Sequence, residues 1–290
     1  MNGRNLNLSR LHNRMADSWN TDWLTRSEMF APLRPVAAGL PAIGWPDLDM
    51  LNALAKDHGR RIANAQGMRV RFVPQAPKAQ SFEAAFEPRA YLRGEVQVRP
   101  FDWHDLFNAL VWMTFPATKA VINARHYESM SATARGNRPP QRDALTLFDE
   151  DGVVVVSSDA ELLELVRGFR WKELFWHRRD AVKEGMRFCV FGHALFSKAL
   201  QPFVGLTGKA VLLEVPGEFL ELAPAPQLAE MDRLLAMHIR GRERFRHGRE
   251  LSPLPVLGVP GWWSGNEREG FYDDTAYFRP GRRQTTVSSR

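Results

Sequence analysis

Residues 142–163, RDALTLFDEDGVVVVSSDAELL, decide the fold that the sequence predicts. Two runs of residues that favour β-structure, 144–148 and 153–157, flank the acidic tetrapeptide DEDG at 149–152. This pattern predicts a β-hairpin with an acidic turn. Ser158 and Glu161 then have the S-x-x-E spacing of a capping box, which predicts that a helix begins directly after the second strand.

Downstream of this stretch, apolar spacing predicts that the helix continues to about residue 183. Further strands are predicted at 187–191 and 210–215, and further helices at 194–200 and 226–245. Strands that alternate with helices in this way indicate an α/β or α+β fold, with a small mixed sheet and helices around it. From residue 253 the chain is rich in proline, glycine and aromatic residues, and we expect this C-terminal tail to wrap around the core.

Upstream, the sequence predicts a helix over 47–65, a short strand over 70–72 and mostly loop over 74–100. Asp102 is a suitable N-cap for a helix over 103–114. Pro116 ends that helix and fits the first turn of a second one, which reaches about Tyr127. Residues 128–141 contain a Pro-Pro pair and are predicted to be a loop.

The composition is that of an ordinary globular protein: 44% of the 290 residues are apolar, 25% are charged, and the net charge is +6. We expect an N-terminal arm over 1–40, one globular domain over 41–280 and a disordered tail over 281–290. No apolar stretch reaches the roughly 20 residues that a bilayer requires, and the Arg-rich start lacks the apolar core of a secretory signal. A cytoplasmic protein without membrane contact is therefore expected.

Polar residues gather on the two helices that flank Pro116. His104 and Asn108 lie at i and i+4 on the first helix, and Lys119, Asn123 and His126 lie at i, i+4 and i+7 on the second. Each set therefore shares one helix face. Together these side chains could bind an anion, transfer protons or ligate a metal, whereas two ordinary solvated faces would also explain the pattern.

His193 follows a predicted buried strand and a glycine, where the next helix begins. Ligands in α/β sheets bind at the carboxyl ends of strands, so His193 is a candidate for proton transfer, although a capping or core histidine is the alternative. The acidic turn at 149–152 could hold a hard cation, or could be a simple soluble turn. In the tail, Asp273 and Asp274 could supply carboxylates if the tail closes over a pocket.

Two other features bear on function. Cys189 is the single cysteine, which excludes a disulfide framework and a Cys-built zinc site; within an apolar strand it is expected to be inert. A basic run, Arg240 to Arg249, could contact the phosphates of a nucleic acid, or could complement the dipole of the helix that it ends.

Several segments resemble a bacterial family of unknown function, DUF3025. They are PFDWHDLFNALVWMTFPATK (100–119), INARH (122–126), RDALTLFDEDG (142–152), FGHAL (191–195), GLTGKA (205–210), PVLGVPGWW (255–263) and FYDDTAYFRP (271–280). The resemblance covers roughly residues 40–280. It implies a bacterial, cytoplasmic protein with a single family-wide domain, and it implies no activity, cofactor or catalytic residue.

The sequence favours a hydrolase or transferase that acts on a small anionic substrate. The residues predicted to be catalytic are His104, Asp105, His126, His193, Asp273 and Asp274, and those predicted to bind substrate are Asn108, Lys119, Asn123, Arg142 and Asp143. No cofactor, metal or oligomeric state is identified from the sequence. The alternatives are a non-catalytic nucleic-acid-binding protein that uses Arg240–Arg249 and exposed aromatic residues, and a protein that binds a partner through its C-terminal tail.

Overall fold

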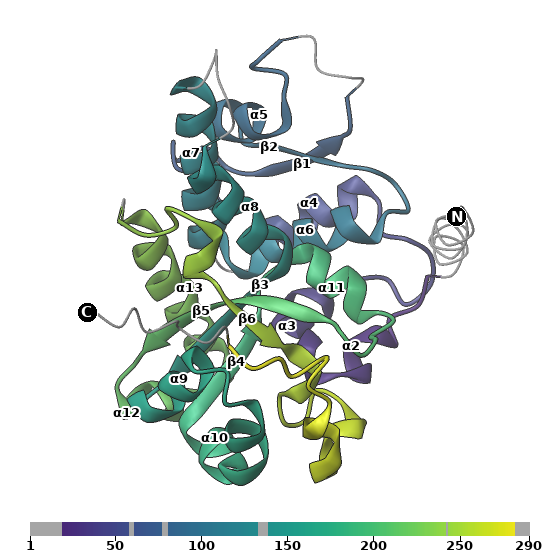
Figure 1. Cartoon of the computed structure of the whole chain (residues 1–290). Helices are drawn as coiled ribbons and strands as arrows, with labels where there is room; N and C mark the ends of the chain where they lie inside the picture. Colours follow the sequence, from purple (N-terminus) through teal and green to yellow (C-terminus); the bar gives the residue numbers. More distant parts are fainter. Residues whose placement is uncertain (1–18, 58–60, 77–80, 133–138, 242, 282–290) are drawn as a thin grey trace, which may run out of the picture.

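A four-stranded mixed sheet forms the centre of the molecule (Figure 1). The computed structural model describes residues 19–57, 61–76, 81–132, 139–241 and 243–281. The strand order is β4-β3-β5-β6, and the strands comprise β3 (Gly152–Ser157), β4 (Met186–Val190), β5 (Thr207–Glu214) and β6 (Ser252–Pro255). Strand β3 pairs antiparallel with β4 and parallel with β5, and β5 pairs antiparallel with β6.

Strand β3 is central because its sequence, GVVVVS, is apolar on both faces. All six of its residues are buried, as expected for a strand that is covered on both sides. A separate two-stranded parallel sheet pairs β1 (Arg71–Pro74) with β2 (Glu95–Val98). The small mixed sheet with helices around it confirms the predicted architecture, and of the two predicted classes, α/β and α+β, the chain has the second.

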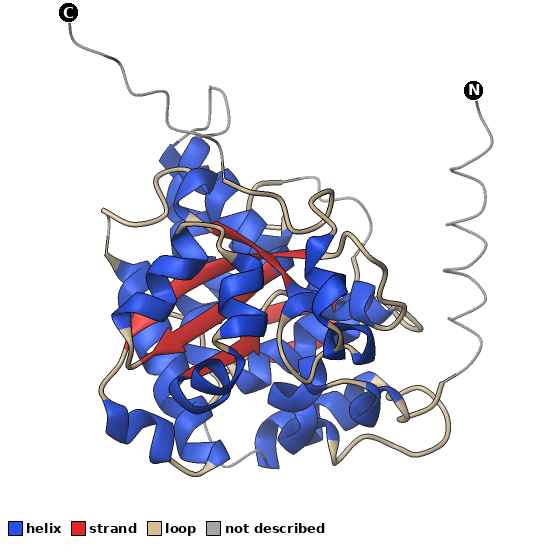
Figure 2. Ribbon diagram, turned by 60° about the horizontal axis from the view of Figure 1, so that its bottom comes forward, coloured by secondary structure: helices blue, strands red, loops and turns tan. Residues whose placement is uncertain are grey.

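Helices surround the strands (Figure 2). In chain order they are α2 (Trp23–Arg26), α3 (Arg34–Ala37), α4 (Leu48–Asp57), α5 (Phe86–Arg93), α6 (Trp103–Thr114), α7 (Pro116–Ala132), α8 (Pro140–Asp151), α9 (Ala160–Arg167), α10 (Arg179–Gly185), α11 (His193–Ala199), α12 (Gly217–Glu221) and α13 (Pro224–Arg240). The break between α6 and α7 falls at Pro116, as predicted, and the side chain of Asp102 caps α6 by accepting a hydrogen bond from the Asp105 amide. No helix in the described ranges is long and apolar enough to cross a bilayer.

The predicted hairpin over 144–157 is wrong, because its first strand is the second half of α8. Pro140 lies in the first turn of α8, where its fixed φ favours a helix and its missing N–H is not needed. Ala144, Leu145 and Phe148 then bury one helical face. Five residues of mixed polarity cannot distinguish a half-buried strand from a helix face, so packing decides between them. The DEDG tetrapeptide consequently ends a helix and begins a strand rather than forming a turn.

Several other predicted boundaries change. The helix predicted to continue to about residue 183 ends at Arg167, and α10 is a separate helix. Residues 74–100 contain α5 and β2 rather than only loop. The N-cap of α9 is Asp159, whose carboxylate accepts from the Glu161 amide, and not Ser158. Helix α4 ends at Asp57 and helix α13 at Arg240, so both are shorter than the apolar periodicity suggested.

The C-terminal tail packs onto the core, as predicted. The Tyr277 hydroxyl donates to the carbonyl of Leu206 at 2.7 Å, and the Trp171 indole donates to the carbonyl of Arg279 at 3.0 Å. In the N-terminal arm, Trp23 and Phe30 are buried. Residues 1–18 of that arm and 282–290 of the predicted disordered tail lie outside the described residues.

Candidate functional site

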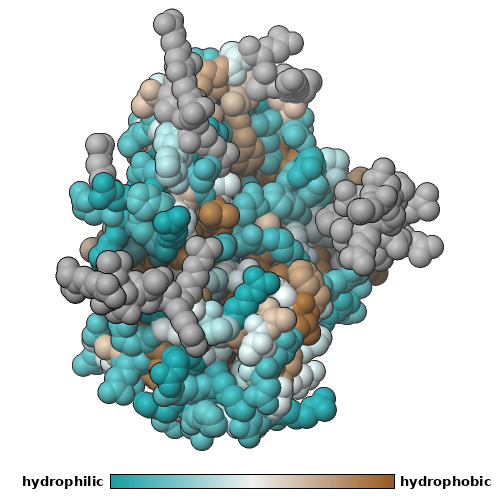
Figure 3. Space-filling view, viewed as in Figure 1, coloured by the Kyte–Doolittle hydropathy of each residue, from teal (hydrophilic) through white to brown (hydrophobic). Residues whose placement is uncertain are grey.

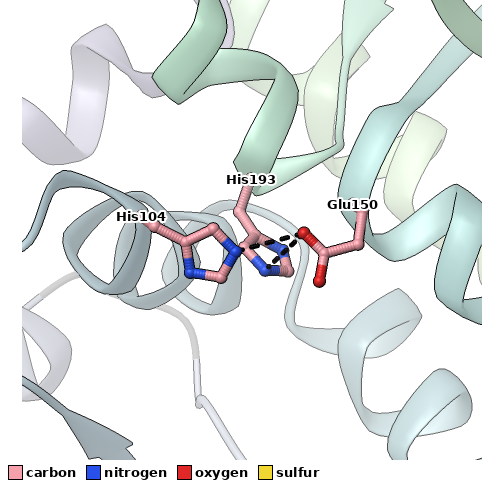
Figure 4. Close-up of side chains that lie close together, drawn as sticks. All are labelled: His104, Glu150 and His193. Carbon is pink, nitrogen blue, oxygen red and sulfur yellow. Dashed lines mark hydrogen bonds and ion pairs between the residues drawn. The ribbon is translucent and has the colours of Figure 1, made fainter. Parts of the chain in front are cut away.

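Three helices bring His104, Glu150 and His193 together (Figure 4). His104 is the second residue of α6, Glu150 is the last but one of α8, and His193 is the first of α11. The Oε2 atom of Glu150 lies 3.1 Å from Nε2 of His104 and 3.5 Å from Nε2 of His193. The two imidazole rings meet edge to face, with centroids 4.4 Å apart.

A close approach of backbone places His193 beside Glu150. The amides of Phe191 and Gly192 both donate to the carbonyl of Gly152, each at 2.9 Å. A Cβ atom on Gly192 would lie 2.4 Å from the carbonyl oxygen of Glu150, nearer than any side chain can come. Glycine at 192 therefore allows α11 to begin directly against the junction of α8 and β3.

The second nitrogen of each imidazole faces an aspartate. Nδ1 of His104 lies 3.2 Å from Oδ1 of Asp105, and Nδ1 of His193 lies 3.9 Å from Oδ2 of Asp149. The Asp105 carboxylate accepts two hydrogen bonds from the Arg99 guanidinium, at 2.7 and 2.8 Å. Both histidines therefore direct Nε2 toward Glu150 and Nδ1 toward a carboxylate.

The acidic residues at this site differ in what neutralises them. Asp149 lies 2.6 Å from the Lys119 ammonium, and Asp151 pairs with Lys198. Asp105 has Arg99, which also lies 3.1 Å from Asp102 and so occupies the position that a cation between these two carboxylates would take. Within the described part of the chain, Glu150 is paired with histidines only.

The surroundings shift the pKa values of the two histidines in opposite directions. Hydrogen bonds that His104 donates to Asp105 and then to Glu150 outweigh burial and raise the pKa of His104 to about 9. Burial lowers the pKa of His193 to about 4. For Asp149 and Glu150, burial acts to raise the pKa, but Lys119 at Asp149 and His104 at Glu150 outweigh it, so both pKa values are lowered. Without a bound cation, the site thus holds one imidazolium, one neutral imidazole and ionised carboxylates.

This donor set fits a divalent metal ion. Ligand bonds of 2.0–2.2 Å in a tetrahedral zinc site place neighbouring ligand atoms about 3.3–3.6 Å apart. The two contacts of Glu150 with the histidines, 3.1 and 3.5 Å, are close to that edge, and all three ligand atoms lie within 4.8 Å of one another. Asp105, 3.2 Å from Nδ1 of His104, matches the carboxylates that orient metal-binding histidines. Asp149 faces Nδ1 of His193 at 3.9 Å, which is an electrostatic contact rather than a hydrogen bond.

The structure brings some of the predicted residues together. His104, Asp105, Lys119 and His193 belong to the connected group just described. Asn108 is buried one helical turn beyond His104 on α6. Farther along α7, His126 is buried, and the amide of Asn123 donates to the backbone and side chain of Glu87.

Other predicted residues lie elsewhere. Arg142 and Asp143 are in the first turn of α8, at the opposite end from Glu150. In the tail, Asp273 pairs with Lys172, and Asp274 accepts hydrogen bonds within its own turn. All nine tryptophans lie within the described ranges, and each is buried or half-buried.

The sequence analysis places Asp149 and Glu150 in an acidic turn that could hold a hard cation or could be a simple soluble turn, and it does not place that turn beside the histidines. Arg99 is not among the predicted site residues. A helical interpretation of 140–151 would have placed Glu150 at the end of a helix. Two features fit it: Pro140 suits a first helical turn, and Leu145 and Phe148 lie on one helix face at i and i+3.

The comparisons with known proteins name a family and nothing more. A family model described as "Protein of unknown function (DUF3025)" matches residues 70–282, which span His104, Glu150 and His193. This confirms the resemblance found in the sequence motifs. No curated protein and no solved structure matches the chain.

Proposed function

We propose that this chain, which belongs to the DUF3025 family, is a metal-dependent hydrolase whose divalent ion is bound by His104, Glu150 and His193. The observation that carries the proposal is the convergence of two imidazole Nε2 atoms on one carboxylate oxygen, with an aspartate facing the far side of each ring. A structural role for a histidine needs only one hydrogen bond and does not require this repeated arrangement.

The ligand number supports catalysis rather than a structural metal. Structural zinc sites are closed by four protein ligands, whereas catalytic sites use three and keep one position open. The side chains of His104 and Glu150 are 38% and 36% exposed, so solvent reaches the side of the centre that they form. A zinc-type ion bound here would lower the pKa of a coordinated water and polarise a carbonyl or phosphoryl group. Solvent access favours water as the acceptor, and therefore a hydrolase over a transferase.

The chain's own residues have defined tasks in this scheme. Glu150 supplies the anionic ligand, and the Arg99–Asp105 pair holds the His104 ring in the orientation that presents Nε2. Lys119 fixes Asp149 beside His193 on the buried side. Arg99 and Lys198 are paired with Asp105 and Asp151, so a small anionic substrate would be attracted chiefly by the metal ion itself.

Metal binding is the decisive measurement. Protein treated with a chelator should bind one equivalent of Zn²⁺ by calorimetry, and His193→Ala and Glu150→Gln should each weaken that binding at least tenfold. His177→Ala is the matched control, because His177 is an exposed histidine outside the centre. Hydrolysis of p-nitrophenyl acetate and bis-p-nitrophenyl phosphate is then compared with and without the metal. Equal Zn²⁺ affinity in wild type and His193→Ala would contradict the proposal.

A further inference from the structure

A groove beside the N-terminus of α6 lies next to the candidate metal centre. Its cavity volume is about 470 Å³, which is within the range of sites that bind small molecules. Proline, leucine and valine side chains from three segments, 46–51, Pro74 and 98–100, form most of the wall, and Asp47, Asp49 and Arg99 are its charged members. Arg99 lines the groove and also holds Asp105, which contacts the His104 ring, so the groove and the centre are two hydrogen bonds apart.

Phe101, directly after the groove wall, has a backbone conformation that burial does not explain. Its φ is +58°, in the left-handed region that a residue with a Cβ atom adopts only at a cost of about 1–2 kcal/mol. The residue is nevertheless 61% exposed. Its ring contacts that of Trp45 edge to face, at 6.1 Å between centroids, and Trp45 directly precedes Pro46, which also lines the groove. Strained residues of this kind cluster where a ligand is held.

We propose that this groove, extended by Trp45 and Phe101, binds an apolar acyl or aryl portion of the substrate while the anionic portion reaches the metal centre. The inference rests on the proposed function. Arg99 lines the groove and donates to Asp105, whose carboxylate also contacts Nδ1 of the candidate ligand His104. A short carboxylic acid derivative with an apolar chain has both of the parts that this arrangement would recognise.

Two probe series separate the groove from the metal centre. The first is n-alkanols from butanol to octanol, which carry no metal-binding charge, titrated against metal-free protein and followed by tryptophan fluorescence. The second is n-alkanoates of the same lengths, titrated against Zn²⁺-loaded protein. In both series the affinity should rise by about fourfold for each added methylene that enters the groove.

Phe101→Gly is the informative variant, because glycine adopts positive φ without strain. We expect the variant to be at least as stable to heat as wild type, while the gain per methylene falls at least twofold. Acetate binding to the Zn²⁺-loaded variant should stay unchanged, because acetate does not reach the groove. Phe203→Ala is the matched control, since Phe203 is 55% exposed and does not line the groove; its chain-length dependence should equal that of wild type.

The outcomes distinguish the two proposals. If metal-free protein shows the chain-length dependence but binds no Zn²⁺, the groove stands and the proposed function fails. If Zn²⁺ binds but neither series depends on chain length, or if Phe101→Gly retains the full dependence, the groove proposal is overturned. Concentration-dependent dimerisation that Phe101→Gly abolishes would also overturn it, because the groove would then be an interface between copies of the chain.

Discussion

The buried ion pair Lys119–Asp149 gives a direct test of how the site is held. The ammonium lies 2.6 and 2.9 Å from the two carboxylate oxygens, and the two side chains are only 4% and 14% exposed. Lys119→Met keeps the length of the side chain but removes its charge, so an ionised carboxylate stays buried without its main partner. Removal of one partner from such a pair costs about 3–5 kcal/mol. For a chain of this size, the melting temperature should fall by about 6–20 °C.

The double variant Lys119→Met/Asp149→Leu removes both charges and should recover most of the lost stability, since an apolar pair of similar volume is often neutral. Arg167→Met is the exposed control: Arg167 pairs with Glu164 at 2.6 Å, and the two side chains are 46% and 68% exposed, so the loss should stay below about 1 kcal/mol. The free energies of unfolding come from urea titrations of metal-free protein, with equal m-values required for the comparison.

Two results would refute this reasoning. One is a loss of less than about 1 kcal/mol in Lys119→Met, the range of an exposed pair. The other is that Lys119→Met/Asp149→Leu is no more stable than Lys119→Met. In that case the unpaired charge of Asp149 would not be the cause of the lost stability. Either would remove the basis for assigning Asp149 a role in orienting His193.

Three further predictions follow from other buried polar groups. Asp232→Ala should cost about 2–4 kcal/mol in urea unfolding, because its fully buried carboxylate accepts from the Thr118 amide at 2.9 Å and caps α7; a loss under 1 kcal/mol would contradict this. Burial and then Arg244 lower the pKa of His238, while Glu250 acts to raise it. As the pH falls below about 6.5, His238 is therefore protonated in the unfolded chain before it is protonated in the folded one, and wild type should lose stability. His238→Gln should show a smaller loss in pH-dependent melting. Burial raises the pKa of Cys189, so iodoacetamide at pH 8 should label it only after unfolding, and rapid labelling of native protein would disprove this.

The sequence predicts the fold where apolar patterning and local chemistry agree. The valine run of β3 is apolar on both faces, as is typical of a strand that is covered on both sides, and the sequence predicts it as a strand. Asp102 and Pro116 similarly set the start of α6 and the break before α7. Around residue 145 these signals conflict. Leu145 and Phe148 are three residues apart and fit a helix, but the β-favouring residues between them fit a strand, and only contacts with distant segments resolve the choice.

The site was harder to predict than the fold, because the position of Glu150 depends on whether residues 144–148 form a strand or a helix. His104 and His193 could be selected one at a time, from a helix start and from the end of a strand. Their proximity depends on α11 packing on α6, a contact between segments about ninety residues apart. The third member, Glu150, became informative only once its segment proved to be helical.

The end of α8 shows why that segment points to function. The carbonyl end of a helix carries partial negative charge, so carboxylates there are unfavourable and basic residues are preferred. Helix α8 ends in Asp149, Glu150 and Asp151 and has no basic residue in its last turn. Two of these charges are offset by lysines from α7 and α11, and the carboxylate of Glu150 is left facing two imidazoles. The pKa of His104 is raised to about 9, so its imidazolium offsets the Glu150 charge when no metal is bound. Under the proposed function, a divalent cation would displace that proton and take over the same task between Glu150 and the two histidines.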